Sequence, residues 1–115
     1  EVMINPQNSK DVEENKLEYI EIWNASDTDQ SLKNLKVIIE EPLTHKKRIC
    51  YLRGADSVKA KSFFLITAKD FRKDFYKLQN IPIVEAGQAK LCGGLSNLTK
   101  KIIKIYRDDR EIDRY

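Results

Sequence analysis

Few side chains in this chain of 115 residues are of types that do chemistry, because it has one histidine and two cysteines. His45 lies among charged and polar residues after Pro42, a composition typical of an exposed loop. Histidine often serves as a general acid or base, but a loop position favours a solvated side chain here. Neither a Gly-x-Ser-x-Gly nucleophile motif nor a glycine-rich phosphate loop occurs. The sequence therefore predicts a protein that is not an enzyme and uses no cofactor.

Two carboxylates, Glu18 and Glu21, lie three residues apart in a segment whose apolar residues alternate as they do in a β-strand. Successive side chains of a strand point to opposite faces of the sheet. The spacing of three therefore predicts that the two carboxylates face opposite sides. We do not expect them to act as an acid and base pair.

The residues that could bind a metal are also not spaced as they are in known kinds of metal site. His45, Cys50 and Cys92 are far apart, whereas the ligands of structural zinc sites come in closely spaced pairs. Asp108, Asp109 and Asp113 lack the closely spaced ligands and the glycine of a calcium loop. We therefore predict no metal site.

The two cysteines allow two interpretations. Cys50 and Cys92 lie among apolar and β-prone neighbours, and a free cysteine buried in such surroundings behaves as a small apolar residue. Alternatively they form a disulfide that closes a loop of about 42 residues, which would stabilise the fold by about 4 kcal/mol and requires an oxidising compartment. We favour two free thiols and leave the disulfide open.

Charge is distributed unevenly along the chain, although the net charge is only +3. Residues 1–45 contain 10 acidic and 4 basic residues, and residues 46–115 contain 8 acidic and 17 basic residues. Such asymmetry predicts either a basic face for nucleic acid or another anion, or two halves that interleave on folding and cancel. We favour the interleaved, solvated arrangement.

Nine basic residues are the candidates for an anion-binding or nucleic-acid-binding surface. They are Lys46, Lys47, Arg48, Arg53, Lys59, Lys61, Lys100, Lys101 and Lys104. Such side chains bind phosphates without reading sequence, although lysines on an edge strand also prevent association between sheets. Tyr51, Phe63 and Phe64 lie in apolar segments and are predicted to be buried, which disfavours stacking on bases.

Short segments rich in β-branched and aromatic residues recur along the chain between turn residues, which is typical of an all-β fold. The predicted strands are Val2–Ile4, Leu17–Trp23, Leu35–Ile39, Arg48–Leu52, Ser62–Ile66, Ile102–Tyr106 and Glu111–Tyr115. The segment Asn24–Asp27 predicts a turn in which side-chain oxygens accept from the nearby backbone, and the segment Arg107–Arg110 predicts a hairpin turn. All apolar runs are far shorter than the roughly 20 residues that cross a bilayer. We predict no membrane-spanning segment, and the first residues lack the pattern of a signal peptide.

One segment departs from the β pattern. Phe71, Phe75 and Leu78 are spaced by four and three residues and would share one face of a helix. Thr67 is placed to cap the first turn. The spacing predicts one short helix over about residues 68–78.

Taken together, these segments resemble the lamin tail domain, an immunoglobulin-like module of nuclear lamins and of many bacterial proteins. Glu1–Pro6 is similar to the family's first strand and its Asn-Pro turn. Glu18–Asn24 resembles the central Glu-aromatic-Ile-Glu-Leu-aromatic-Asn strand, and Asp29–Leu32 resembles the step that follows. Leu95–Asn97 and then Ile112–Asp113 resemble the closing segments, the latter as in bacterial members.

The resemblance implies an immunoglobulin-like β-sandwich that spans residues 1–115 as a single domain, excised from a larger protein. It also implies a non-catalytic interaction module that attaches the larger protein to a protein or cell-surface partner outside the cytoplasm. The alternative function is nucleic-acid binding through the basic half of the chain. The alternative location is the nucleus, as for a eukaryotic lamin.

Overall fold

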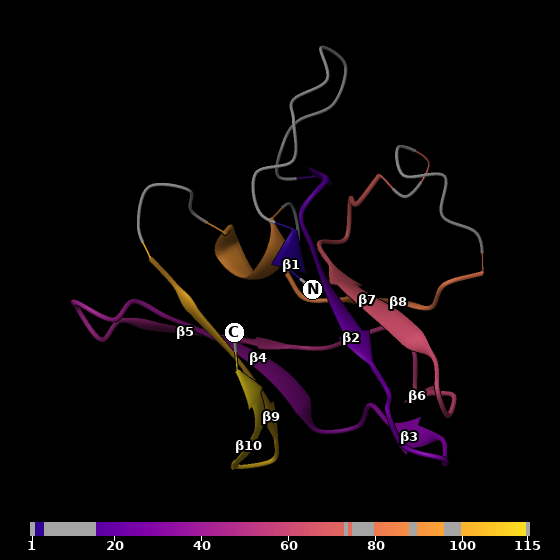
Figure 1. The fold of residues 1–115 in the computed structure, drawn as a ribbon. Helices are drawn as coiled ribbons and strands as arrows, with labels where there is room; N and C mark the ends of the chain where they lie inside the picture. The colour runs from indigo at the N-terminus through magenta and orange to yellow at the C-terminus, as the bar shows by residue number, and fades with distance from the viewer. Residues whose placement is uncertain are drawn as a thin grey trace.

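The computed structural model describes residues 2–3, 16–72, 74, 80–87, 90–95 and 100–114, which are mostly strands in several sheets (Figure 1). The strands are β1 (Val2–Met3), β2 (Tyr19–Trp23), β3 (Gln30–Ser31), β4 (Leu35–Glu40), β5 (Lys47–Tyr51), β6 (Ser57–Val58), β7 (Phe63–Thr67), β8 (Ile83–Glu85), β9 (Ile102–Arg107) and β10 (Arg110–Arg114). A short 3-10 helix, η2 (Leu91–Gly93), precedes β9. The predicted all-β class is confirmed for this part of the chain.

The strands form two four-stranded sheets and one two-stranded sheet. The first has the order β1-β2-β7-β8 and the second the order β10-β9-β4-β5, while β3 pairs with β6. All pairs are antiparallel except β7 and β8, which are parallel. In Figure 1 the strands β2, β7 and β8 lie to the right, and β4, β9 and β10 lie below and to the left.

Alternating apolar side chains of both four-stranded sheets meet in one core. In β4, Val37 and Ile39 are buried, and in β9 Ile103 and Ile105 are buried between more exposed neighbours. Ile20 of β2 lies opposite Ile66 of β7, and neither is accessible to solvent. All belong to one hydrophobic cluster. Burial of these side chains, worth about 1.5–3 kcal/mol each, holds the two sheets together.

Seven strands were predicted, and each overlaps an observed strand with bounds that differ by no more than about two residues. The predicted hairpin is also confirmed, because Arg107 pairs with Arg110 and two residues connect them. Three strands were missed, namely β3, β6 and β8. They are two or three residues long and are too short to show a period of two.

The predicted helix is wrong where the structure describes it. Thr67 is the last residue of β7 rather than a helix cap, and Ala68 is buried in the core. The backbone N–H of Arg72 donates to the carbonyl of Lys16 at 2.9 Å instead of to the carbonyl four residues earlier. A long-range hydrogen bond therefore replaces the helical one. Residues 73 and 75–79 of the predicted helix lie outside the described residues.

The turn after β2 is organised by one buried amide. Asn24 is 7% exposed, and its Nδ2 donates to the carbonyls of Thr28 and Lys59 at 3.0 Å and of Val58 at 3.4 Å. Its Oδ1 accepts from the backbone N–H and the hydroxyl of Ser26. Asn24 thus joins the end of β2 to the segment after β6, and the predicted side-chain-to-backbone turn is confirmed at this residue.

Candidate anion-binding site

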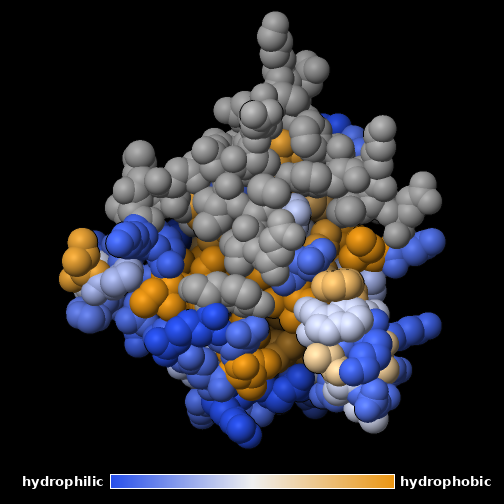
Figure 2. Space-filling view, in the orientation of Figure 1, coloured by the Kyte–Doolittle hydropathy of each residue, from blue (hydrophilic) through white to orange (hydrophobic). Residues whose placement is uncertain are grey.

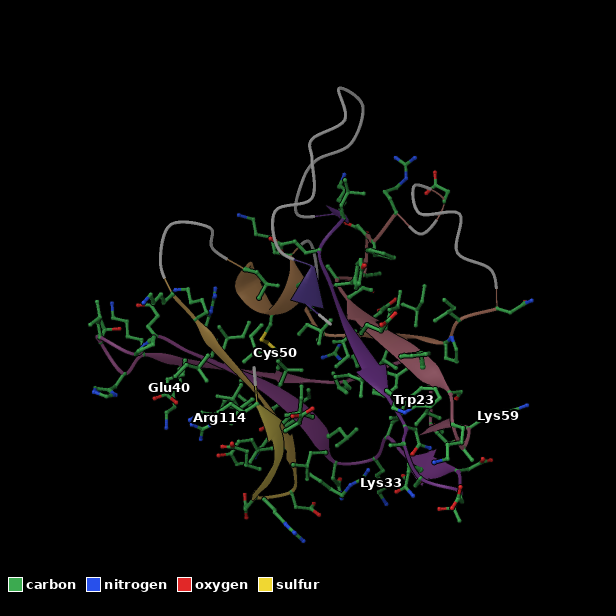
Figure 3. All side chains as sticks on the ribbon, viewed as in Figure 1. Trp23, Lys33, Glu40, Cys50, Lys59 and Arg114 are labelled. Carbon is green, nitrogen blue, oxygen red and sulfur yellow. A yellow bond between two sulfur atoms is a disulfide. The ribbon has the colours of Figure 1, made fainter. Side chains whose placement is uncertain are left out.

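Cys50 of β5 and Cys92 of η2 are joined by a disulfide, with their Cα atoms 5.6 Å apart. The preference for two free thiols was therefore wrong. Figure 3 shows the sulfur atoms between β5 and the coil of η2. In the described chain β5 pairs only with β4, so it is the outer strand of the second sheet. The disulfide links η2 to this outer strand.

Arg48 supplies a second link between the same two elements. It lies two residues before Cys50 in β5, so both side chains point to the same face of the strand. Its Nη1 donates to the carbonyl of Gly93 and its Nη2 to the carbonyl of Gly94, both at 2.7 Å. A Cβ added to Gly93 would lie 2.7 Å from Nη1 of Arg48. A side chain at this position would therefore displace the guanidinium, and the φ of +80° at Gly93 also favours glycine.

Arg48, Gly93 and Gly94 line one side of an open depression of about 610 Å³, here called the basic depression. Five basic side chains line it, and Glu41 is the one acidic residue among those that line it. The lining residues are Ile39, Glu41, Lys46, Lys47, Arg48, Lys90, Gly93, Gly94, Leu95 and Lys101. The excess of positive charge, in a concave surface with an apolar base, suits an anionic group.

Ion pairs divide the cations around this depression into two kinds. Lys101 is nearly buried and bonds to Glu41, which lowers the pKa of that carboxyl. Lys104 of β9 donates to Glu40 of β4 at 2.6 Å, and these two side chains are 13% and 12% exposed. Lys101 and Lys104 therefore neutralise the protein's own carboxylates. Lys46, Lys47 and Lys90 are exposed and line the depression, and Nζ of Lys47 lies 3.9 Å from a carboxylate oxygen of Glu40.

The pKa of Glu40 lies below its ordinary value, chiefly because Lys104 donates a hydrogen bond to its carboxylate. Such a carboxyl binds fewer protons in the folded state, so its stabilisation is complete above the ordinary pKa and is lost as the pH falls through the lowered one. We expect the free energy of unfolding to decrease between about pH 5 and pH 3, and Glu40→Gln to remove part of this decrease. Urea denaturation across this range measures it.

Lys104→Met serves as the matched variant, since it removes the donor and keeps Glu40. It should reduce the same acid sensitivity. If both variants keep the wild-type slope of unfolding free energy against pH, the ion pair does not contribute to acid stability.

The nine predicted basic residues do not form one surface. Lys46, Lys47, Arg48 and Lys101 line the depression, with Lys104 beside them and exposed Lys100 adjacent in sequence. The other three lie elsewhere. Lys59 and Glu40 lie on opposite sides of the view in Figure 3.

The three remote residues have their own local contacts, and the carbonyl of Lys59 accepts hydrogen bonds from Asn24 and Ser62. Arg53 forms an isolated bridge with Glu85 through backbone hydrogen bonds. Lys61 contacts the carbonyl of Ala25 and lies 3.6 Å from a carboxylate oxygen of Asp27. These residues therefore belong to turns and strand ends rather than to the basic depression.

Lys90 was not among the predicted residues. It is 42 positions after Arg48, and only its place two residues before Cys92 gives a hint of its location. The disulfide brings the segment of Cys92 to Cys50 and carries Lys90 to the side of Lys47 and Arg48.

Two of the three aromatic residues predicted to be buried are exposed. Tyr51 is 67% exposed at the end of β5, and Phe63 is 44% exposed, while Phe64 is buried as predicted. Phe63 and Phe64 are consecutive in β7, so they must face opposite sides, and the ring of Phe63 packs on that of Trp23 at a centroid distance of 4.4 Å. The exposed ring of Tyr51 is therefore accessible for stacking on a base.

The other side chains considered for catalysis or metal binding either form structural hydrogen bonds or are exposed to solvent. Glu18 is 4% exposed, and its Oε2 accepts from the backbone N–H of Leu95. His45 has an exposed side chain whose Nδ1 lies 3.8 Å from Glu40. In the described ranges, no group of three or more His, Cys, Asp or Glu side chains is arranged to hold a metal ion. No helix within them is long and apolar enough to cross a membrane.

No protein-family model, curated protein or solved structure matches the chain.

Proposed function

We propose that the chain is a non-catalytic binding module that attaches a larger protein to an anionic protein or cell-surface partner. The single observation that carries the proposal is the basic depression, where Lys46, Lys47 and Lys90 stand exposed around a rim held by Arg48. A ligand that neutralises these side chains gains charge-assisted hydrogen bonds without first reorganising the wall.

The resemblance to lamin tail domains and their immunoglobulin-like sandwich is part of the same proposal. It is supported by strands at the predicted positions along the chain and by two four-stranded sheets that share one core. It is also supported by Asn24, the last residue of the family-like segment, which is buried and joins two parts of the chain. Such a module presents edges and loops to a partner.

A location outside the cytoplasm is supported by the disulfide, because bridges of this kind persist in oxidising compartments. In a nucleus, where glutathione and thioredoxin keep thiols reduced, Cys50 and Cys92 would exist as thiols. The extracytoplasmic location is therefore the better proposal.

Charge reversal at the depression tests the proposal. We expect the wild-type protein to bind a fluorescein-labelled poly-glutamate chain at low salt, with an affinity that decreases as salt is raised. Lys46→Glu with Lys90→Glu should weaken this binding at least tenfold, because both changes replace attraction by repulsion. Fluorescence anisotropy measures the affinity.

The matched control is Lys33→Glu with Lys59→Glu, which makes the same change in net charge at exposed residues outside the depression. It should weaken binding by much less. Equal losses for the two double variants would show that net charge alone attracts the ligand, and the depression would not be the site.

Nucleic-acid binding is the second candidate function, and the exposure of Tyr51 favours it. The ring lies four residues after Lys47 in β5, so these two side chains point to the same face of the strand. A single-stranded nucleic acid could therefore place a phosphate near Lys47 and a base on the ring. We expect Tyr51→Ala to weaken binding of a labelled single-stranded oligonucleotide and to leave poly-glutamate binding unchanged. A preference for poly-glutamate over an oligonucleotide of equal charge would remove this candidate.

A further inference from the structure

An apolar cavity of about 300 Å³ opens at the other end of β4 from the basic depression and shares no lining residue with it. We call it the apolar hollow. Its base consists of buried side chains from five strands or their ends, namely Leu32, Leu35, Val58, Phe64 and Ile105. Trp23 and Ile112 line its mouth and are 45% and 49% exposed. Figure 2 shows apolar surface recessed between the hydrophilic β9–β10 hairpin and the end of β2.

The polar groups of the hollow are few, and most are already bonded. The amide of Asn24 is used in the turn after β2. Nε2 of Gln30 donates to the hydroxyls of Ser26 and Thr28. These two side chains therefore shape the wall and leave Arg107 as the cation available to a ligand.

Arg107 is unusual because it is a cation on the inner side of its strand. Ile103, Ile105 and Arg107 alternate along β9, so Arg107 follows the two buried isoleucines on the core-facing side and lines the hollow. Its Nη2 donates to the carbonyl of Ser31 at 2.7 Å, which fixes the guanidinium at the mouth. Among the residues that the structure describes, no carboxylate forms an ion pair with it. Since a guanidinium has five N–H donors, it can still bind a carboxylate.

We propose that the apolar hollow binds a small apolar monocarboxylate, with its hydrocarbon part on the buried base and its carboxylate on Arg107. Ligand cavities are about 300–1,000 Å³, lined mainly by apolar side chains with a few polar groups that set orientation. The hollow is at the lower limit of this range and holds one charged donor. It therefore suits a medium-chain or aromatic acid better than a long-chain lipid.

Trp23 is the single tryptophan of the chain and lines the mouth, so its fluorescence reports on the hollow directly. Titration with octanoate should give a saturable change in emission, and octanol and octylamine should bind more weakly because they lack the carboxylate. Arg107→Gln should weaken octanoate binding at least tenfold, because it removes the charge and keeps a polar side chain. Arg110→Gln is the control, since Arg110 is on the same hairpin but does not line the hollow.

A second variant separates loss of binding from loss of folding. Ala25 is an exposed residue that lines the hollow, and Ala25→Leu should narrow the mouth and reduce octanoate binding while thermal unfolding stays close to wild type. Lys46→Glu with Lys90→Glu should leave octanoate binding unchanged, so this inference and the proposed anion surface fail independently. Equal responses to octanoate and octanol, no saturation, or unchanged binding by Arg107→Gln would each overturn the inference.

Discussion

Reducing the bridge between Cys50 and Cys92 is expected to lower the free energy of unfolding by about 4 kcal/mol, because the bridge closes a loop of 42 residues. Single domains have a total of about 5–15 kcal/mol, so the reduced protein should be folded but much closer to unfolding. Urea denaturation with and without a reductant measures the difference. The basic depression should respond too, since the covalent link between η2 and β5 is lost and the hydrogen bonds of Arg48 to Gly93 and Gly94 remain.

Cys50→Ser with Cys92→Ser provides the control for this experiment. Its stability should match that of the reduced wild-type protein, and adding the reductant should not change it. If the reductant shifts both proteins equally, its effect comes from another source. If neither the reductant nor the double variant lowers stability, the loop closed by the bridge does not constrain the unfolded chain.

Replacing Asn24 should produce the second large effect. Asn24→Ala removes the amide that donates to the carbonyls of Thr28 and Lys59 at 3.0 Å and of Val58 at 3.4 Å. The hydroxyls of Ser26 and Ser62 still donate to the first two carbonyls, so the loss is that of the three bonds from Asn24. We expect the free energy of unfolding to decrease by about 2–4 kcal/mol, because three intramolecular hydrogen bonds worth about 1 kcal/mol each are lost. Urea denaturation of the oxidised protein measures it.

Two further variants identify the donor as the cause. Asn24→Asp has nearly the same volume but places an oxygen against the two carbonyls, so it should destabilise at least as much as Asn24→Ala. Ser26→Ala removes a partly exposed hydroxyl that donates to the amide oxygen of Asn24 and to the carbonyl of Thr28, but it keeps the three bonds that Asn24 donates, and it should cost about 1 kcal/mol or less. If Asn24→Asp were as stable as wild type, the three donated hydrogen bonds would not hold the turn.

The longer strands were predictable because apolar and polar residues alternate within each of them. In β9, Ile103 and Ile105 alternate with more polar residues, and this pattern of period two exists whatever the strand pairs with. The same reasoning failed at Thr67, where the spacing of Phe71 and later apolar residues predicted a helix. A backbone hydrogen bond from Arg72 to Lys16 and the burial of Ala68 changed the outcome, and neither depends on residues near in sequence.

Whether a side chain near the end of a strand is buried could not be predicted from the neighbouring sequence either. Tyr51 and Phe63 have the composition of core residues, but a strand has two faces, and only the position of its neighbours decides which face meets the core. Tyr51 lies on the outer strand of its sheet and stays exposed. Arg107 shows the opposite case, a charged residue on the inner side at the open end of the core.

By itself, the sequence determined the all-β class, most of the strands, the Asn24 turn and the hairpin at Arg107–Arg110, because each depends on residues within a few positions. It also placed abundant basic charge in the second half of the chain. Only the tertiary structure decided that Cys50 bonds to Cys92 and that Lys90 joins Lys47 and Arg48. The tertiary structure also places Lys59 away from Lys47, Arg48 and Lys90. Long-range pairing of sheets and loops sets these distances, and no local pattern of residue types encodes that pairing.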